Sequence, residues 1–75
     1  MKVKKFSTNF FFNGESYNLL SYKVFNLEDL IKFFNYKQNL VVVEYNGKIV
    51  HPQKWKKILL KKNDQIELVT IVGGG

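Results

Sequence analysis

Two Asn-Gly dipeptides constrain the fold of this chain more than any other feature, and they stand at Asn13-Gly14 and Asn46-Gly47. An Asn-Gly pair supplies the two positive φ angles of a type I′ turn, the tight turn of many β-hairpins. Each pair lies between runs of apolar or β-branched residues. We therefore predict two hairpins, the first joining a strand that ends at 10–12 to a strand at 15–20, and the second joining strands at 40–45 and 48–50.

The segment between the two hairpins has the pattern of an amphipathic helix. Its apolar residues recur at i, i+3, i+4 and i+7, the spacing of one helix face: Leu27, Leu30, Ile31 and Phe34. Asn26 is a favourable N-cap, and Glu28 and Asp29 fall in the first turn, where the helix dipole favours negative charge. We predict a helix that starts after Asn26 and buries this apolar stripe in the core.

The last third of the chain predicts a short turn and a final strand. Residues 52–55 begin with proline and are typical of a short helical or 3₁₀ turn, and Asn63 suits a left-handed turn position. Residues 65–72 are nearly all strand formers. Alternation along this strand turns Ile66 and Leu68 toward the helix and leaves three residues outward: Glu67, Val69 and Ile71.

This order of elements is typical of an α+β fold, in which one main helix crosses one face of a mixed sheet. The 75 residues leave room for one domain, which we assign to 1–72, followed by a flexible glycine tail at 73–75. The chain has no cysteine and a single histidine, so it lacks the residues for disulfides, thiolate chemistry or a histidine-rich metal cluster. We expect a chain of this size not to act as an enzyme on its own.

The positive charge of the chain is a weak guide to its partners. Lysine supplies all twelve basic residues behind the net charge of +6, and arginine and alanine are absent. This composition follows codons rich in A and T, which indicates a biased genome such as that of a plastid or a low-G+C bacterium. Because arginine dominates base recognition, we expect no nucleic-acid partner and interpret the densest lysines as a solvated face: Lys54, Lys56, Lys57, Lys61 and Lys62.

The sequence also predicts neither a membrane span nor a secretory signal. No apolar run approaches the roughly 20 residues that cross a bilayer. The basic start of the chain has no apolar segment behind it. We therefore expect no membrane partner.

The chain ends in Gly73-Gly74-Gly75, which are three of its five glycines. Three residues without side chains form a slim thread that spans about 10 Å and can enter a narrow active site. The terminal carboxylate would then be the substrate of another enzyme. Because a carboxylate is a poor electrophile, it must become an acyl-adenylate before a sulfur or amine nucleophile attacks it. We therefore single out Gly75 as the candidate site of modification.

Four segments in order resemble the ThiS family, the ubiquitin-like sulfur carriers of thiamine biosynthesis: VVVEYNGKIV at 41–50, Trp55, NDQIELV at 63–69 and VGGG at 72–75. The resemblance covers about residues 8–75, and the first seven residues look like an N-terminal extension. Two turns depart from the family pattern. His51-Pro52 stands where Pro-Arg is usual, and Asn63-Asp64 replaces Gly-Asp.

The resemblance implies a β-grasp (ubiquitin-like) fold and a carrier with no bound cofactor or metal. A ThiF-like adenylyltransferase would use ATP and Mg²⁺ to adenylate Gly75. A cysteine desulfurase or rhodanese-like protein would supply the sulfur of a terminal thiocarboxylate, and the thiazole synthase ThiG would consume it. The outward residues of the last strand, Glu67, Val69 and Ile71, are the expected interface with the activating enzyme. The expected location is the plastid stroma or a bacterial cytoplasm.

Other functions stay open at this point. Carriers for molybdopterin synthesis or tRNA thiolation share the fold and a diglycine end, although the short length and the position of Trp55 favour the thiamine branch. A ubiquitin-like modifier would appear as conjugates on the lysines of other proteins. A small basic nucleic-acid-binding module would show an affinity that falls steeply with salt.

Overall fold

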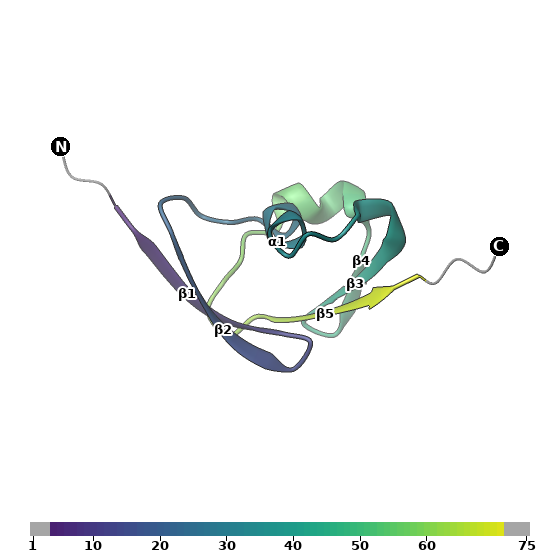
Figure 1. Cartoon of the computed structure of the whole chain (residues 1–75), viewed down its shortest axis with the longest axis horizontal. Coiled ribbons are helices and arrows are strands. Elements are labelled where there is room, and N and C mark those ends of the chain that lie inside the picture. The colour runs from purple at the N-terminus through teal and green to yellow at the C-terminus, as the bar shows by residue number, and fades with distance from the viewer. Residues whose placement is uncertain (1–3, 72–75) are drawn as a thin grey trace.

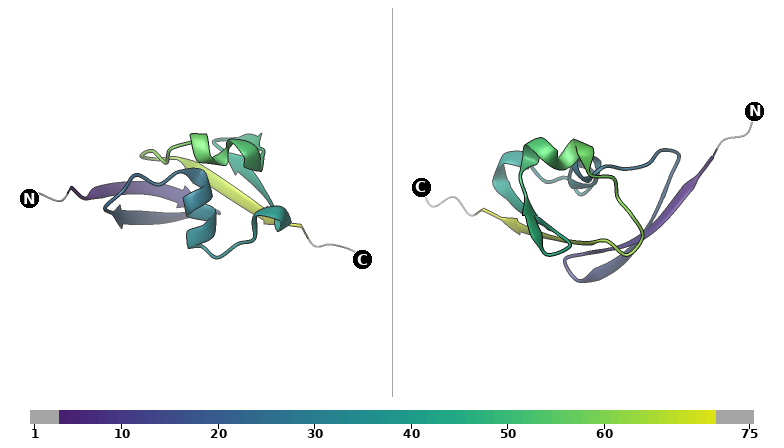
Figure 2. Two further views of the ribbon diagram at one scale, coloured as in Figure 1. Left: turned by 90° about the horizontal axis from the view of Figure 1, so that it is seen from above. Right: turned by 180° about the vertical axis from the view of Figure 1, so that it is seen from behind.

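The computed structural model describes residues 4–71 (Figure 1). A five-stranded mixed sheet forms one layer, and a helix and a 3₁₀ segment lie together on one of its faces (Figure 2). This arrangement confirms the predicted α+β architecture. The elements in chain order are β1 (Phe6–Phe12), β2 (Glu15–Ser21), α1 (Leu27–Phe33), the 3₁₀ segment η1 (Gln38–Leu40), β3 (Val41–Tyr45), β4 (Lys48–Val50), the 3₁₀ segment η2 (Pro52–Lys57) and β5 (Gln65–Thr70).

Both Asn-Gly pairs form the predicted hairpin turns. Asn13 and Gly14 have φ angles of 50° and 81°, and Asn46 and Gly47 have φ angles of 49° and 86°. These are left-handed angles, which Gly and Asn adopt more readily than other residues. Asn63 has a φ of 66°, so the turn before β5 is also as predicted.

β1 begins at Phe6, four residues before the apolar run at 10–12. Phe6 and Ser7, the last two residues of the segment 1–7 that we interpreted as an extension, both pair with β2. The polar start of β1 is held by a cross-strand amide, because Asn18 Nδ2 donates to Ser7 Oγ at 3.0 Å and to Asn9 Oδ1 at 2.7 Å. Pairing with β2 therefore fixes a strand where the alternation of apolar residues is broken.

The last strand lies in the middle of the sheet. The strand order is β2-β1-β5-β3-β4, with β5 parallel to β1 and antiparallel to β3. The parallel contact is short and places Phe11 opposite Gln65 and Phe12 opposite Ile66. The start of β1 and the end of β5 consequently lie at opposite ends of the molecule (Figure 1).

α1 begins where the sequence predicts. Asn26 Oδ1 accepts the backbone N–H of Asp29 at 2.8 Å, and the Asp29 carboxylate accepts the backbone N–H of Asn26 at 3.0 Å, which together form a capping box. The hydrogen bond from Asn26 lowers the pKa of the Asp29 carboxyl, with Lys23 as a further cause. Phe34, the expected last member of the apolar stripe, is the C-cap of α1, and its ring stacks on Phe12 with 4.2 Å between centroids.

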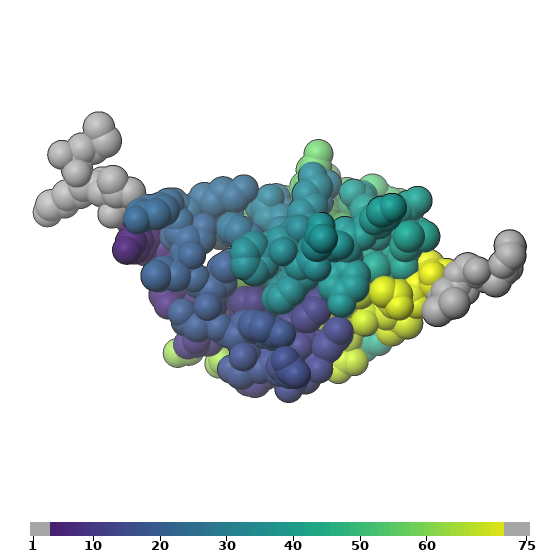
Figure 3. Space-filling model, viewed as in Figure 1, coloured from purple at the N-terminus to yellow at the C-terminus, as the bar shows by residue number. Residues whose placement is uncertain are grey.

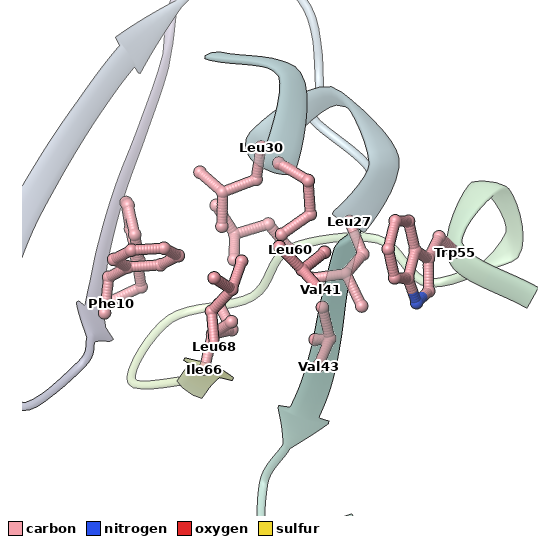
Figure 4. Packing of buried hydrophobic residues seen from close by; sticks show 11 residues of the cluster. Phe10, Leu27, Leu30, Val41, Val43, Trp55, Leu60, Ile66 and Leu68 are labelled. Atoms are coloured by element: carbon pink, nitrogen blue, oxygen red, sulfur yellow. The ribbon is translucent and has the colours of Figure 1, made fainter. Parts of the chain in front are cut away.

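The core lies between α1, η2 and the inner face of the sheet (Figure 4). β5 contributes Ile66 and Leu68, as predicted, and Leu68 is 8% exposed. Trp55 of η2 is fully buried, and its indole N–H donates to the carbonyl of Val50 at 2.9 Å. The buried apolar residues are Phe10, Phe12, Leu27, Leu30, Ile31, Val41, Val43, Trp55, Leu60, Ile66 and Leu68.

Candidate functional site

β5 and the residue after it carry the predicted partner interface. Glu67, Val69 and Ile71 are all exposed, Val69 to 65% and Ile71 to 50%. Alternation along the strand therefore turns them outward, as the sequence predicts, and their role as an interface stays a prediction. The C-terminal part of β5, drawn in yellow, lies at the surface of one end of the molecule (Figure 3). The predicted tail and modification site lie outside the described residues: Gly73, Gly74 and Gly75.

The register of β3 against β5 enlarges this surface. Val42 lies opposite Val69, and the carbonyl of Leu40 accepts the backbone N–H of Ile71 at 2.7 Å. Residues that lie opposite one another in a sheet share a face. The sequence pattern missed the contribution of β3 and β4, since register between distant strands leaves no local signal. We name this surface the outer face; it consists of Leu40, Val42, Glu44, Ile49, Glu67, Val69 and Ile71.

A buried carboxylate fixes the start of β5. Asp64 is 5% exposed, and its side chain accepts hydrogen bonds from the Tyr45 hydroxyl at 2.6 Å, the Asn46 side-chain amide at 3.1 Å and the Lys61 backbone N–H at 2.7 Å. Its backbone carbonyl also accepts the N–H of Phe11 at 2.8 Å. Asp64 thus joins β1, the end of β3 and the turn that precedes β5.

This carboxylate also changes the acidity of its neighbour. Burial raises the pKa of Tyr45 to about 12, and the hydrogen bond to the Asp64 carboxylate adds to the increase. A tyrosine with this pKa stays protonated at neutral pH and keeps donating to Asp64. The contact is therefore a structural one that holds the site in place.

The two hairpin asparagines bind β5 from its two sides. Asn13 Oδ1 accepts the backbone N–H of Leu68 at 2.8 Å, and Asn46 Oδ1 accepts the backbone N–H of Gln65 at 2.7 Å. The backbone N–H of Asn13 also donates to the carbonyl of Ile66 at 2.9 Å. Each turn residue that the sequence marked for its φ angle therefore also anchors the strand that leads to the C-terminus.

The remaining candidate side chains form no reactive group. His51 is exposed and immediately precedes η2, and the lysines of the predicted solvated face are exposed as well. Within residues 4–71, no three His, Cys, Asp or Glu side chains gather closely enough to hold a metal ion. Over the same stretch, no helix combines the length and the apolar character that a membrane span requires.

Known proteins show the same fold and sequence pattern. The family model of the ThiS family matches residues 10–75. The protein named ycf40 of Trieres chinensis is 45% identical over an alignment of 75 positions, which covers 97% of this chain and 100% of that protein. The sulfur carrier protein ThiS of Bacillus subtilis is 33% identical over 49 residues, which are 65% of this chain and 74% of that protein.

A solved structure shows that the similarity to the ThiS family includes the fold. The thiamine biosynthesis protein ThiS of Geobacter metallireducens matches with a TM-score of 0.77 and 25% identity, over 91% of this chain and 100% of that chain. This match confirms the β-grasp fold that the sequence resemblance implied. The family match covers most of the chain and reaches its last glycine. The chain therefore belongs to the ThiS family.

Proposed function

We propose that this protein is a sulfur carrier for thiazole synthesis, and that its Gly75 carboxylate is adenylated and then converted to a thiocarboxylate. The match to the ThiS family, which runs through the terminal glycines, is the observation that carries the proposal. The position of β5 adds support, because this central strand is anchored on both sides up to a few residues before the terminus. A partner that docks on the end of β5 is only a few residues from Gly75, so the terminal carboxylate can reach its active site.

The proposed chemistry takes place on partner enzymes. On a ThiF-like adenylyltransferase, the Gly75 carboxylate attacks the α-phosphate of ATP, with Mg²⁺ bound to the phosphates, and pyrophosphate leaves. The terminal sulfur of a persulfide, supplied by a cysteine desulfurase or a rhodanese-like protein, then attacks the acyl carbon and displaces AMP. This gives an acyl disulfide that is still joined to the donor. A thiol then attacks the donor's sulfur and forms a disulfide with it, which releases the terminal thiocarboxylate. The thiocarboxylate delivers its sulfur to the thiazole synthase ThiG. The carrier is the co-substrate in each step.

The glycine tail is the part of the carrier that enters the activating enzyme. Closure around a slender tail keeps water from the acyl-adenylate, which would otherwise hydrolyse. We expect Gly74→Phe, and deletion of Gly74 and Gly75, to abolish carrier-dependent ATP–pyrophosphate exchange by the adenylyltransferase. The matched control is Lys62→Phe, a bulky substitution at an exposed turn, which should retain exchange. Wild-type exchange by Gly74→Phe would contradict a narrow entry for the tail.

Docking on the outer face is tested separately from the tail. Ile71→Asp places a charge on the exposed surface beside β5, and we expect it to raise the KM for the carrier while the urea midpoint is unchanged. Leu20→Asp is the matched control, because Leu20 is similarly exposed at 60% but lies on the edge strand β2, where it pairs with the start of β1. Equal kinetics for the two variants would remove Ile71 from the proposed interface.

The thiamine branch and the compartment belong to the same proposal. The names of the Bacillus and Geobacter proteins favour ThiG as the acceptor over molybdopterin or tRNA thiolation. The ycf40 relatives of Trieres chinensis, Pyropia yezoensis and Porphyra purpurea support the plastid stroma, with a bacterial cytoplasm as the alternative. Thiocarboxylated carrier should yield thiazole with ThiG and its substrates. Transfer to molybdopterin synthase alone, or conjugation to lysines, would assign a different branch.

A further inference from the structure

The outer face has a composition unlike that of the rest of the chain. Five of its seven residues are exposed apolar side chains: Leu40, Val42, Ile49, Val69 and Ile71. The other two are glutamates, and none is a lysine, although lysine accounts for twelve of the 75 residues. α1 and η2 cover the opposite face of the sheet and leave this one bare (Figure 2). The outer face is therefore an apolar surface with local negative charge on a protein of net positive charge.

The two glutamates face each other across the sheet. Glu44 and Glu67 are directly opposite in the β3–β5 register, and both are exposed. Like charges in this position repel, so the pair weakens the sheet. Among the ion pairs between residues 4–71, none includes either glutamate. The two glutamates therefore do not stabilise the carrier by itself.

The other described carboxylates all have partners. Glu28 pairs with Lys32 and Lys56, and Asp29 pairs with Lys23. The remaining two, Glu15 and Asp64, accept hydrogen bonds from tyrosine hydroxyls. Within residues 4–71, Glu44 and Glu67 are therefore the two carboxylates that can pair with a positive side chain of another protein.

We propose that the outer face docks on the activating enzyme through an arginine that the enzyme places between Glu44 and Glu67, with apolar side chains over Val42 and Val69. This inference rests on the proposed function. A guanidinium presents several N–H donors in one plane and can bind two carboxylates at once. Its charge removes the repulsion between the glutamates on docking. Because Val69 and Ile71 continue the surface toward the C-terminus, the same contact directs the tail to the enzyme.

Charge also argues against a second copy of the chain as the occupant. Two outer faces packed on each other bring four carboxylates together, and neither copy supplies a lysine from that face. A partner with a positive side chain surrounded by apolar residues matches both the negative charge and the apolar side chains of the outer face. The acidic pair would therefore select the enzyme surface over self-association.

The experiment measures carrier-dependent ATP–pyrophosphate exchange by the ThiF-like adenylyltransferase of the same organism. We expect Glu44→Gln and Glu67→Gln each to raise the KM for the carrier about tenfold, and Glu67→Lys to raise it about a hundredfold, with kcat within about twofold of wild type. The KM of wild type should rise with salt, and this dependence should weaken in the glutamine variants. Glu15→Gln, an exposed carboxylate on β2, is the matched control and should match wild type.

The results of this experiment distinguish the arginine contact from the carrier function. Normal exchange with wild type but an unchanged KM in the glutamine variants would overturn the arginine contact and leave the carrier function in place. No exchange with wild-type carrier would overturn both. Thermal midpoints equal to or above that of wild type are expected for the glutamine variants, because a repulsive pair is removed. Dimerisation of the free carrier through the outer face, detected by sedimentation and abolished by Val69→Asp, would assign the face to a second copy and overturn the inference.

Discussion

Replacing Asp64 should strongly destabilise the fold, because this one buried side chain binds three donors from separate segments. Its carboxylate accepts three hydrogen bonds, from Tyr45, Asn46 and Lys61, and it is almost completely buried. Hydrogen bonds to a charged group contribute about 1.5 to 3 kcal/mol each. Three at the lower end of that range are partly offset by the desolvation of the carboxylate, so we expect Asp64→Ala to lower the free energy of unfolding by about 3 to 4 kcal/mol. A domain of this size has roughly 4 to 11 kcal/mol in total.

Two variants separate the loss of the hydrogen bonds to Asp64 from the loss of its side-chain atoms. Asp64→Asn keeps the shape but turns an amide toward one of the three donors, and we expect a loss of about 1 to 2 kcal/mol. Tyr45→Phe removes a single hydrogen bond and should also cost about 1 to 2 kcal/mol. Urea unfolding followed by the fluorescence of the fully buried Trp55 gives the free energies. A loss for Asp64→Ala no larger than that for Tyr45→Phe would refute the role of the Asp64 carboxylate as the link between the end of β3 and the turn before β5.

Three further predictions follow from the core, from the pKa of Tyr45 and from the helix cap. Leu68→Ala should lower the free energy of unfolding by about 2 to 5 kcal/mol in urea titrations, because it leaves a cavity under α1, and a cost below 1 kcal/mol would contradict the burial of this side chain. The pKa of Tyr45 is raised from 10.0 to about 12, so its contribution to stability is complete below pH 10 and is lost as the pH rises toward 12. The difference between wild type and Tyr45→Phe in urea midpoints should therefore shrink over that range, and a constant difference would rule out the link. Asn26→Ala should cost about 1 kcal/mol by calorimetry through loss of the capping box, whereas Asn39→Ala in the exposed η1 should cost much less.

The local elements of the fold could be predicted because their signals are local. The Asn-Gly pairs specify φ angles that few other residues adopt, and Asn26 with the acidic first turn specifies where α1 begins. Strand order gives no such signal. The parallel contact of β5 with β1 joins residues more than fifty positions apart, and nothing in either segment alone indicates that the last strand enters the centre of the sheet. The β-grasp prediction came from the resemblance to the ThiS family.

The candidate site, too, could be predicted only where its sequence signal is local. Alternation in β5 predicted that Val69 and Ile71 face outward, because the neighbouring Leu68 is clearly a core residue. The run Val41-Val42-Val43 is uniformly apolar, so alternation does not tell which residue faces out. The register with β5 decides it, and it brings Val42 and Glu44 beside Val69 and Glu67. The second role of Asn13 and Asn46 as acceptors for β5 was missed for the same reason.

Intact-mass spectrometry can show whether Gly75 becomes a thiocarboxylate. The carrier is incubated with the ThiF-like adenylyltransferase, ATP, Mg²⁺ and a persulfide donor, with a parallel sample that lacks ATP. We expect a mass increase equal to the exchange of one oxygen for sulfur, only with ATP, and fragment ions that place it on Gly75. The same increase on an internal residue, or in a chain from which Gly74 and Gly75 have been deleted, would contradict thiocarboxylate formation at Gly75.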